Sequence, residues 1–238
     1  MYIDECLKDK ITYSNLQQYI NSEHKILLST EKSFIVLMPK YNIYIADCKD
    51  SECENLAKEL NKYNINIIAI FNDNLFELIK SKFKGNNVSY QAYYDGEKIE
   101  KNKNLIYLKE EDLDYVKNTY NNGEYKSEVE ESFKTKNLLG YYENGKLIGF
   151  IGRHIDGSIG MLYVKEEFRR KGYGSIILKS VYSFWENQVP FSHVIIGNIA
   201  SENLHKKIGC KFGKKKIYWL RNEIQIIILT IKILFLFK

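Results

Sequence analysis

Proline and cysteine are scarce in this sequence, and the cysteines follow no pattern that holds a metal. The 238 residues include two prolines and four cysteines. The cysteines form no Cys-x-x-Cys pair and have no histidines at a matching spacing, so no metal site is expected. Unpaired thiols are typical of a reducing compartment. The N-terminal stretch MYIDECLKDK carries acids and lacks the apolar core of a secretory signal, so a cytoplasmic location is expected.

Long apolar runs are also few. The most apolar segment, IQIIILTIKILFLFK, lies in the 222–238 tail, is shorter than the about 20 residues that a spanning helix needs, and contains Lys232. No membrane span is expected. The role of this apolar tail stays open between an extra strand, an edge that binds a partner and an addition without structure.

The charge balance is only mildly basic. There are 35 lysines and arginines against 30 aspartates and glutamates, a net charge of +5, and the cations are spread along the chain. Nucleic-acid binders concentrate their cations on one face, so no nucleic-acid partner is expected. The lysine clusters at 206–207 and 214–216 keep a basic nucleic-acid-binding module as an alternative.

Short strand-like and helix-like runs alternate along the chain, which predicts an α/β fold. In residues 1–100, KILLST, SFIVLMP and YNIYIAD are predicted strands, SECENLAKELNKY is a helix, INIIAIF is a buried strand, and NDNLFELIKSKF is a second helix. The polar stretch DGEKIEKNKN has no periodicity and is predicted to connect two domains, 1–100 and 101–221.

The second domain is predicted to repeat the element order of the first. LIYL is a predicted strand, and EEDLDYVKNTY is a predicted helix with acids in its first turn. SEVEESFK is a predicted helix with Ser127 and Glu130 as its capping box, and the strands LLGYY and KLIGFIGRHI are joined by Glu143-Asn144-Gly145, a hairpin signal. A strand SIGMLYV, a helix GSIILKSVYSFW, a strand HVIIGN, a short helix and a strand KIYWLR follow. Two tandem copies of one fold are therefore expected, each with a mixed central sheet flanked by helices.

The segment FRRKGYG, residues 168–174, stands between a predicted strand and a predicted helix. Backbone N–H groups of such a loop, together with the positive end of the helix, favour phosphate oxygens. A P-loop would need Gly-Lys followed by Ser or Thr, and a dinucleotide fingerprint would need a third glycine where Ile177 stands. Charge alone does not distinguish this phosphate site from a solvated basic turn.

The surrounding segment LYVKEEFRRKGYGSIIL resembles the cofactor-binding core of the GNAT superfamily of acyl-CoA-dependent N-acetyltransferases, whose pattern is Val-x-Pro-x-x-Arg-x-x-Gly-x-Gly/Ala. Val164, Arg169, Gly172 and Gly174 match this pattern, and Glu166 stands at the usual proline. The segment HVIIGNIASENLHKKIGC follows in the expected order, and the resemblance covers residues 103 to 221.

A second segment, HVIIGNIASENLHKKIGC, resembles the next strand and helix of that family. His205 stands at the usual tyrosine position and Cys210 at the usual phenylalanine position. The residues in register with the family pattern are Asn198, Ser201, Leu204, Lys207 and Gly209.

The resemblance implies a GNAT N-acetyltransferase domain at 101–221 that uses acetyl-CoA as co-substrate, without a metal. The acceptor would be the primary amine of a small molecule or a peptide, attacking the thioester directly, and the protein would be a monomer or a homodimer. The resemblance implies these cofactor-binding residues: Leu162, Tyr163, Val164, Arg169, Arg170, Lys171, Gly172, Tyr173, Gly174, Asn198 and Ser201.

Catalytic roles follow less directly from the resemblance. His205 would be the general acid in place of the tyrosine, with a helix histidine that has no catalytic role as the alternative. No general base is assigned among Glu166, Glu167 and His154. A CoA-binding regulatory or inactive module is the alternative function. The 1–100 domain would be a degenerate copy, because its junction ADCKDSECEN has four acids and no glycine and would repel phosphate.

Overall fold

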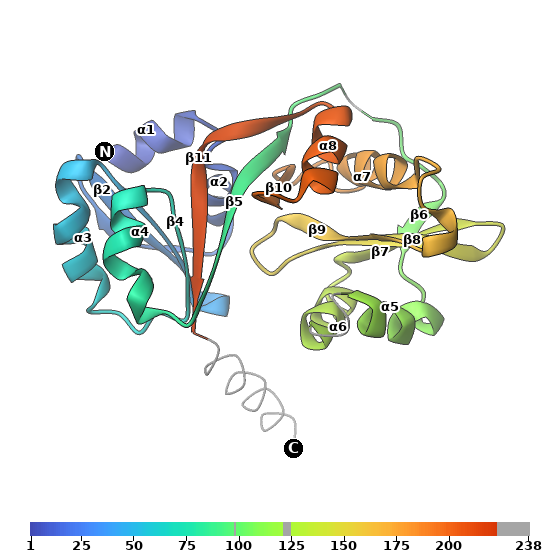
Figure 1. Cartoon of the computed structure of the whole chain (residues 1–238), viewed down its shortest axis with the longest axis horizontal. Helices are drawn as coiled ribbons and strands as arrows, with labels where there is room; N and C mark the ends of the chain where they lie inside the picture. Colours follow the sequence, from blue (N-terminus) through green and yellow to red (C-terminus); the bar gives the residue numbers. More distant parts are fainter. Residues whose placement is uncertain (98, 121–124, 223–238) are drawn as a thin grey trace, which may run out of the picture. The chain divides into compact units, whose positions relative to one another are not determined.

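The computed structural model describes residues 1–97, 99–120 and 125–222 (Figure 1). The chain forms two compact units. Unit 1 comprises Met1–Gln91, Val194–Gly197 and the chain from Phe212 onward, and unit 2 comprises Ala92–His193 and Asn198–Lys211. This division differs from the single boundary expected near residue 100, because a late strand returns the chain to unit 1. The apolar tail, from residue 223 onward, lies outside the described residues.

The elements of unit 1 follow the order helix, helix, three strands, helix, strand, helix. They are α1 (Tyr2–Lys8), α2 (Ser14–Ile20), β1 (Lys25–Ser29), β2 (Ser33–Met38), β3 (Ile43–Cys48), α3 (Cys53–Leu60), β4 (Ile67–Ile70) and α4 (Asp73–Ile79).

Unit 2 repeats this order after one short strand. Its elements are β6 (Leu105–Tyr107), α5 (Leu113–Thr119), α6 (Lys126–Lys134), β7 (Leu138–Glu143), β8 (Lys146–Arg153), β9 (Ile159–Val164), α7 (Tyr173–Phe184) and α8 (Ile199–Lys207). Three strands contribute residues to both units, and they are β5 (Gly85–Tyr94), β10 (Phe191–Ile195) and β11 (Cys210–Arg221).

The α/β prediction is confirmed, and the predicted strands and helices correspond to elements of the structure. The hairpin at Glu143-Asn144-Gly145 is present, with Asn144 and Gly145 at positive φ values of 49° and 76°. The capping box was wrong, because α6 begins one residue earlier, after Tyr125, without a side-chain cap. Glu130 instead pairs with Lys117 on α5 at 2.5 Å.

Three elements had no counterpart in the sequence analysis: α1, α2 and β5. The two helices are only seven residues long, too short for a clear 3.6-residue period. The strand β5, GNNVSYQAYY, begins with glycine and two asparagines, which strands seldom contain.

Two sheets organise these strands. One has the order β1-β2-β3-β4-β11-β5-β10, and the other has the order β6-β7-β8-β9. In unit 1, β3 and β4 are parallel neighbours, with Ile43 opposite Ile67 and Ala46 opposite Ile70. Their counterparts in unit 2, β9 and β10, belong to different sheets. With the same order of elements, β3 and β4 therefore form a hydrogen-bonded parallel pair, whereas β9 and β10 do not pair with each other.

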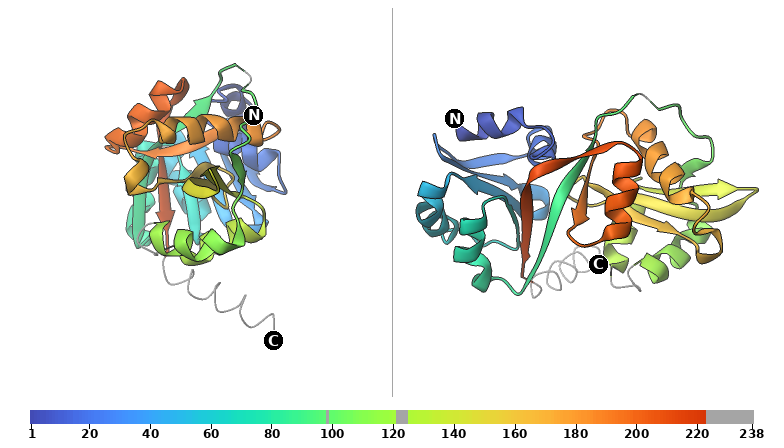
Figure 2. Two further views of the ribbon diagram at one scale, coloured as in Figure 1. Left: turned by 90° about the vertical axis from the view of Figure 1, so that its right-hand side faces the viewer. Right: turned by 45° about the horizontal axis from the view of Figure 1, so that its top comes forward.

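Helices cover both faces of the smaller sheet in unit 2. Helices α5 and α6 lie on one face of β7, β8 and β9, and α7 lies on the other (Figures 1 and 2). The buried residues on the α5 and α6 side include Val116, Val129, Leu138 and Phe150. The opposite face packs on α7, whose Ile177 and Val181 are fully buried. This layering fixes β9 between two helical layers.

In unit 1, side chains alternate between the two faces of β3. Tyr44, Ala46 and Cys48 join the core formed with α3 and α4. Asp47 points to the other face, where it is fully buried. Strand alternation thus places one carboxylate under α1 and α2.

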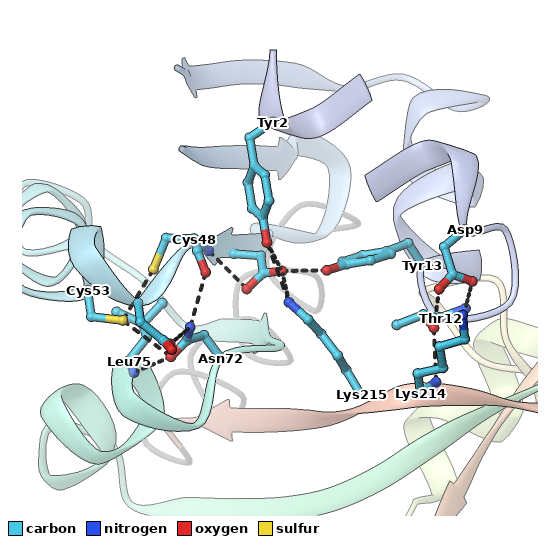
Figure 3. Close-up of polar contacts among 12 residues, drawn as sticks. Tyr2, Asp9, Thr12, Tyr13, Cys48, Cys53, Asn72, Leu75, Lys214 and Lys215 are labelled. Carbon is cyan, nitrogen blue, oxygen red and sulfur yellow. Dashed lines mark hydrogen bonds and ion pairs between the residues drawn. The ribbon is translucent and has the colours of Figure 1, made fainter. Parts of the chain in front are cut away.

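Four groups satisfy the Asp47 carboxylate, and the residues that supply them, Tyr2, Tyr13, Cys48 and Lys215, are labelled in Figure 3. The hydroxyls of Tyr2 and Tyr13 donate to Oδ2 at 3.1 and 2.6 Å, Lys215 Nζ on β11 lies 2.9 Å from the same oxygen, and the amide of Cys48 donates to Oδ1 at 2.9 Å. Burial and the nearby carboxylate raise the pKa of both tyrosines, so both remain protonated donors. The cluster ties α1, α2, β3 and β11 together within unit 1.

Replacing Asp47 by Ala is expected to lower the free energy of unfolding by about 2–3 kcal/mol, because two tyrosine donors and the Lys215 ammonium lose their partner. The loss of stability is not expected to be larger, because the Lys215 ammonium is partly exposed and water can solvate it in the variant. Urea denaturation followed by circular dichroism measures it. Asp4→Ala is the matched control, since Asp4 is an exposed residue paired with the N-terminus and should change stability by less than about 0.5 kcal/mol. Equal stabilities of the two variants would contradict the role of the cluster.

Candidate functional site

The strand β9 is the last strand of its sheet, so within the described chain it has a strand partner on one edge only. The amide of Lys165 donates to the Ile148 carbonyl on β8 at 3.0 Å. Successive residues of a strand direct their backbone groups to opposite edges, so Val164 and Leu162 direct theirs away from β8. The Val164 carbonyl accepts from Arg169 Nε at 3.0 Å, which agrees with this direction. The outer edge of β9 therefore presents backbone donors and acceptors.

Tyr163 lies between these two outward residues and differs from them. It pairs with Phe150 on β8, and the two rings stack with centroids 5.3 Å apart. The backbone groups of Tyr163 thus face β8. Of the three strand residues predicted to bind the cofactor, Leu162 and Val164 direct their backbone to the open edge and Tyr163 does not.

A β-bulge interrupts β9 next to these residues. Phe150 stands opposite Tyr163 and Gly152 opposite Gly160, so two residues of β9 face one residue of β8. Met161, in the bulge, has a positive φ of 52°. A bulge bends its strand and turns backbone groups out of the ladder, and bulges are over-represented beside active sites.

The basic loop that follows β9 is held partly by its own charged side chains. Arg169 bonds the end of β9, lies 3.3 Å from the Glu166 carboxylate and stacks over the Tyr163 ring at 5.2 Å. Lys171 Nζ donates to the Glu167 carbonyl at 3.0 Å. Arg170 is exposed and has a positive φ of 63°. Arg169 therefore fixes the loop to the strand, whereas Arg170 projects from a left-handed turn.

The loop ends in the N-terminus of α7, where Gly172 is the N-cap residue at a φ of 88° and no side chain caps the helix. The first N–H groups of a helix have no partner within the helix. A Cβ added at Gly172 would meet nothing within 4 Å, so the space beside this N-cap residue is open. The twelve-residue helix adds the positive end of its dipole at the same point. This geometry suits a phosphate group.

Both predicted motifs meet at this helix end. A Cβ added at Gly174 would lie 3.8 Å from the Leu204 side chain on α8, so the glycine permits a close approach of the two helices. Asn198 caps α8 by accepting a hydrogen bond from the Ser201 amide at 3.1 Å. Asn198 is exposed and Ser201 is partly exposed. The structure thus brings the glycine loop and α8 together in unit 2.

His205 lies on α8 one turn after Ser201 and is 6% exposed. Its Nδ1 donates to the Ser201 carbonyl at 2.8 Å, because a carbonyl only accepts. Burial lowers its pKa, and the bond to Ser201 opposes this only in part. His205 is therefore neutral near pH 7, with its proton on Nδ1. The buried Nε2 has no hydrogen-bond partner among the described residues, and it carries a lone pair rather than a proton to donate.

Two polar contacts at the site had no counterpart in the sequence analysis. The Tyr173 hydroxyl, in the first turn of α7, donates to Glu143 at 2.7 Å. His154, just after β8, contacts Glu128 on α6 at 2.7 Å. These pairs join residues 26 and 30 positions apart, and no local pattern in the sequence reveals them.

Within residues 1–97, 99–120 and 125–222, no group of three or more His, Cys, Asp or Glu side chains could hold a metal ion. In the same part of the chain, no helix combines the length and the apolar character needed to cross a membrane.

Solved structures resemble this chain over most of its length. An X-ray structure of a Drosophila protein covers 93% of this chain and 88% of its own, with 16% identity and a TM-score of 0.56. A GNAT-family acetyltransferase from Colwellia psychrerythraea covers 93% and 97%, with 12% identity and a TM-score of 0.51. A GCN5-related N-acetyltransferase from Kribbella flavida covers 89% and 94%, with 11% identity and a TM-score of 0.52. At these identities the likeness establishes the fold.

A family model matches the part of the sequence that forms most of unit 2. No curated protein matches the chain. The acetyltransferase (GNAT) family model matches residues 103–210, which contain the open strand β9, the glycine loop and α8. This match identifies a GNAT acetyltransferase domain at residues 103–210, and the solved structures agree with it in fold.

Proposed function

We propose that unit 2 binds acyl-CoA, with acetyl-CoA as the natural donor, and transfers the acyl group to a primary amine of a small molecule or a peptide. One observation carries this proposal: the open edge of β9 is followed, after the loop at residues 165–172, by the uncapped N-terminus of α7. A ligand with an extended amide-containing arm and a pyrophosphate matches both parts. Acetyl-CoA has these two features, and GNAT proteins generally use it.

In this proposal the chain holds the donor with its backbone. Leu162 and Val164 pair with the amides of the pantetheine arm as an added strand would. The N–H groups of Gly172, Tyr173 and Gly174 bind the pyrophosphate, and Arg170 adds positive charge. Arg169 positions the loop rather than binding phosphate, because Val164 and Glu166 already engage its guanidinium.

Asn198 and Ser201 lie on the neighbouring helix and are proposed to bind the donor from the other side. Their hydrogen bond, in which the Asn198 side-chain oxygen accepts from the Ser201 amide, orders the first turn of α8, and the Ser201 hydroxyl lies 3.4 Å from His205 Nδ1. The close approach at Gly174 supports their membership of the same site.

Bound acetyl-CoA supplies a thioester, whose carbonyl carbon is the electrophile. The protein has to hold the amine in line with that carbon, remove a proton from the attacking nitrogen and stabilise the developing oxyanion. The bulge at Met161 turns backbone groups out of the β9 ladder and is the proposed source of oxyanion stabilisation.

The leaving group needs no strong acid in this mechanism, because a thiolate with a conjugate pKa of about 8.5 departs readily. His205 in its neutral Nδ1–H form offers no proton at Nε2. This observation also favours a second candidate function, a CoA-binding module without turnover. Thiol release from acetyl-CoA with a panel of amines separates the two functions.

Unit 1 is proposed to be a degenerate copy that does not bind CoA. Its repeated element order supports a common origin, while the hydrogen-bonded pair of β3 and β4 leaves no open edge. The acidic junction after β3 would also repel phosphate. Two lysines that favoured nucleic-acid binding are paired with acids here: Lys215 contacts Asp47 at 2.9 Å, and Lys216 contacts Asp73 at 3.9 Å. The four free buried cysteines support a cytoplasmic location for this activity.

Gly172→Val is expected to abolish stabilisation by acetyl-CoA, because a branched side chain would fill the space beside the N-cap of α7. Wild-type protein at a ligand concentration of 100 Kd should gain about 2.7 kcal/mol, measured as a rise in melting temperature. Gly209→Val is the matched control. Gly209 has a φ of 91° and equally open surroundings, but it follows the far end of α8. Both variants should lose similar stability without ligand, and only Gly172→Val should lose the ligand response. An unchanged response of Gly172→Val would refute the phosphate site.

His205 is expected to titrate below its ordinary pKa of about 6.5 and to carry its neutral proton on Nδ1. Because the folded state disfavours the charged form, the contribution of His205 to stability is complete above the unfolded-state pKa and declines as the pH falls below it. Long-range proton–nitrogen NMR correlation spectra report both the tautomer and the pKa. An Nε2–H tautomer, or a pKa above 6.5, would restore His205 as a general acid.

A further inference from the structure

His154 and Glu128 form a close pair on the face of unit 2 that carries α5 and α6. His154 follows the last residue of β8, and its Nδ1 lies 2.7 Å from Glu128 Oε1 on α6. Their side chains are 30% and 20% exposed. The pair is therefore shielded enough to interact strongly and open enough to be reached by a substrate.

The imidazole of this pair lies directly against β9. A Cβ added at Gly160 would overlap the His154 ring, and Nε2 is the nearest ring atom. Gly160 is followed by Met161, the bulge residue. The absence of a side chain at Gly160 thus lets Nε2 approach the strand beside the bulge. Six residues of β9 span about 20 Å, so an extended arm that starts at the glycine loop ends near this point.

The carboxylate fixes the protonation pattern of His154. A carboxylate only accepts, so Nδ1 carries the proton and the neutral ring has its lone pair on Nε2. Burial lowers the pKa of His154, but the hydrogen bond and charge of Glu128, together with the charge of Asp156, raise it above its ordinary value. Tyr120 also faces Glu128, and the carboxylate and burial raise its pKa, so it stays uncharged.

A second carboxylate, Asp156, lies two residues after His154 and is bound elsewhere. It contacts His193 Nε2 at 2.9 Å and accepts from the Ser158 hydroxyl at 2.7 Å. The negative charge of Asp156 therefore raises the pKa of His154, while its carboxylate oxygens bind His193 and Ser158. Glu128 remains the direct partner of His154.

We propose that His154 is the general base of the acyl transfer and that Glu128 is the residue that positions it. This assignment rests on the proposed function, and it places the acceptor amine on the α5 and α6 side of β9. Nε2 accepts a proton from the attacking nitrogen as the new C–N bond forms. The thioester C–S bond breaks, its electron pair leaves with sulfur as the thiolate, and the proton on His154 returns to solvent.

An alkylating analogue tests this placement without knowledge of the acceptor. Bromoacetyl-CoA carries an electrophilic carbon where acetyl-CoA carries its methyl group. The Nε2 lone pair would displace bromide from that carbon, forming a C–N bond and releasing one bromide ion. Competing thiols are suppressed, because all four cysteines are buried and burial raises the pKa of Cys6 and of Cys210 to about 11.

The expected result is one adduct per chain, located on His154 by peptide mass spectrometry and suppressed by excess CoA. His154→Gln should lose the adduct while acetyl-CoA still raises its melting temperature. Its thiol release with an accepted amine should fall about 100-fold. An adduct on His205, His193 or a glutamate, or no adduct in protein that CoA stabilises, would overturn the assignment. Failure of CoA to stabilise the protein at all would overturn the proposed function instead.

Glu128→Gln distinguishes a positioning role from a merely structural one. Loss of the negative charge lowers the pKa of His154, so the rate of bromoacetyl-CoA labelling should reach half of its plateau at a lower pH, and the plateau should be smaller. Glu130→Gln is the control, because Glu130 lies on the same helix and pairs with Lys117. Identical pH profiles for Glu128→Gln and wild type would contradict the role of Glu128.

Discussion

The outer edge of β9, which pairs with no strand of the described chain, is the constraint on which the structure of unit 2 depends. A strand edge carries donors and acceptors that must find partners, and at Val164 one of them binds Arg169 of the following loop. The same edge leads from the bulge at Met161 to the open N-terminus of α7. Backbone donors and acceptors therefore line this region, and few positions in it require a particular side chain. Solved structures with the same fold share as little as 11–16% of their residues with this chain.

Unit 1 illustrates what happens when the equivalent edge is closed. There β3 pairs with β4, and the side chain that points under α1 and α2 is Asp47, satisfied by two tyrosines, a lysine and an amide. The backbone groups of β3 thus bind β4, and the buried Asp47 carboxylate binds groups of the same unit. The same order of elements thus gives two different results. In unit 1 the strand β3 pairs with β4, and in unit 2 the corresponding strand β9 has one edge without a strand partner in the described chain.

Sequence reasoning identified the features that local patterns encode. Alternation and helical periodicity predicted the main strands and helices, and the order Gly-x-Gly between a strand and a helix indicated the loop before α7. It did not distinguish Arg169 from Arg170, because only the fold reveals that one guanidinium returns to the strand end. It also missed the contact between His154 and Glu128, which requires α6 to cross the end of β8. Contacts between elements that are distant in the sequence depend on how those elements pack. Local patterns in one sequence do not show which residues will meet.

Hydrogen–deuterium exchange with and without acetyl-CoA tests the central claim most directly. The account predicts slower exchange in the peptides that contain Leu162 and Val164 and in those that contain Gly172 to Gly174, with no change in β3 of unit 1. Ligand protection is measured at the backbone groups themselves, so it does not depend on the identity of the acceptor. Protection confined to β3 and the start of α3, or no protection at β9 in protein saturated with acetyl-CoA, would contradict the account.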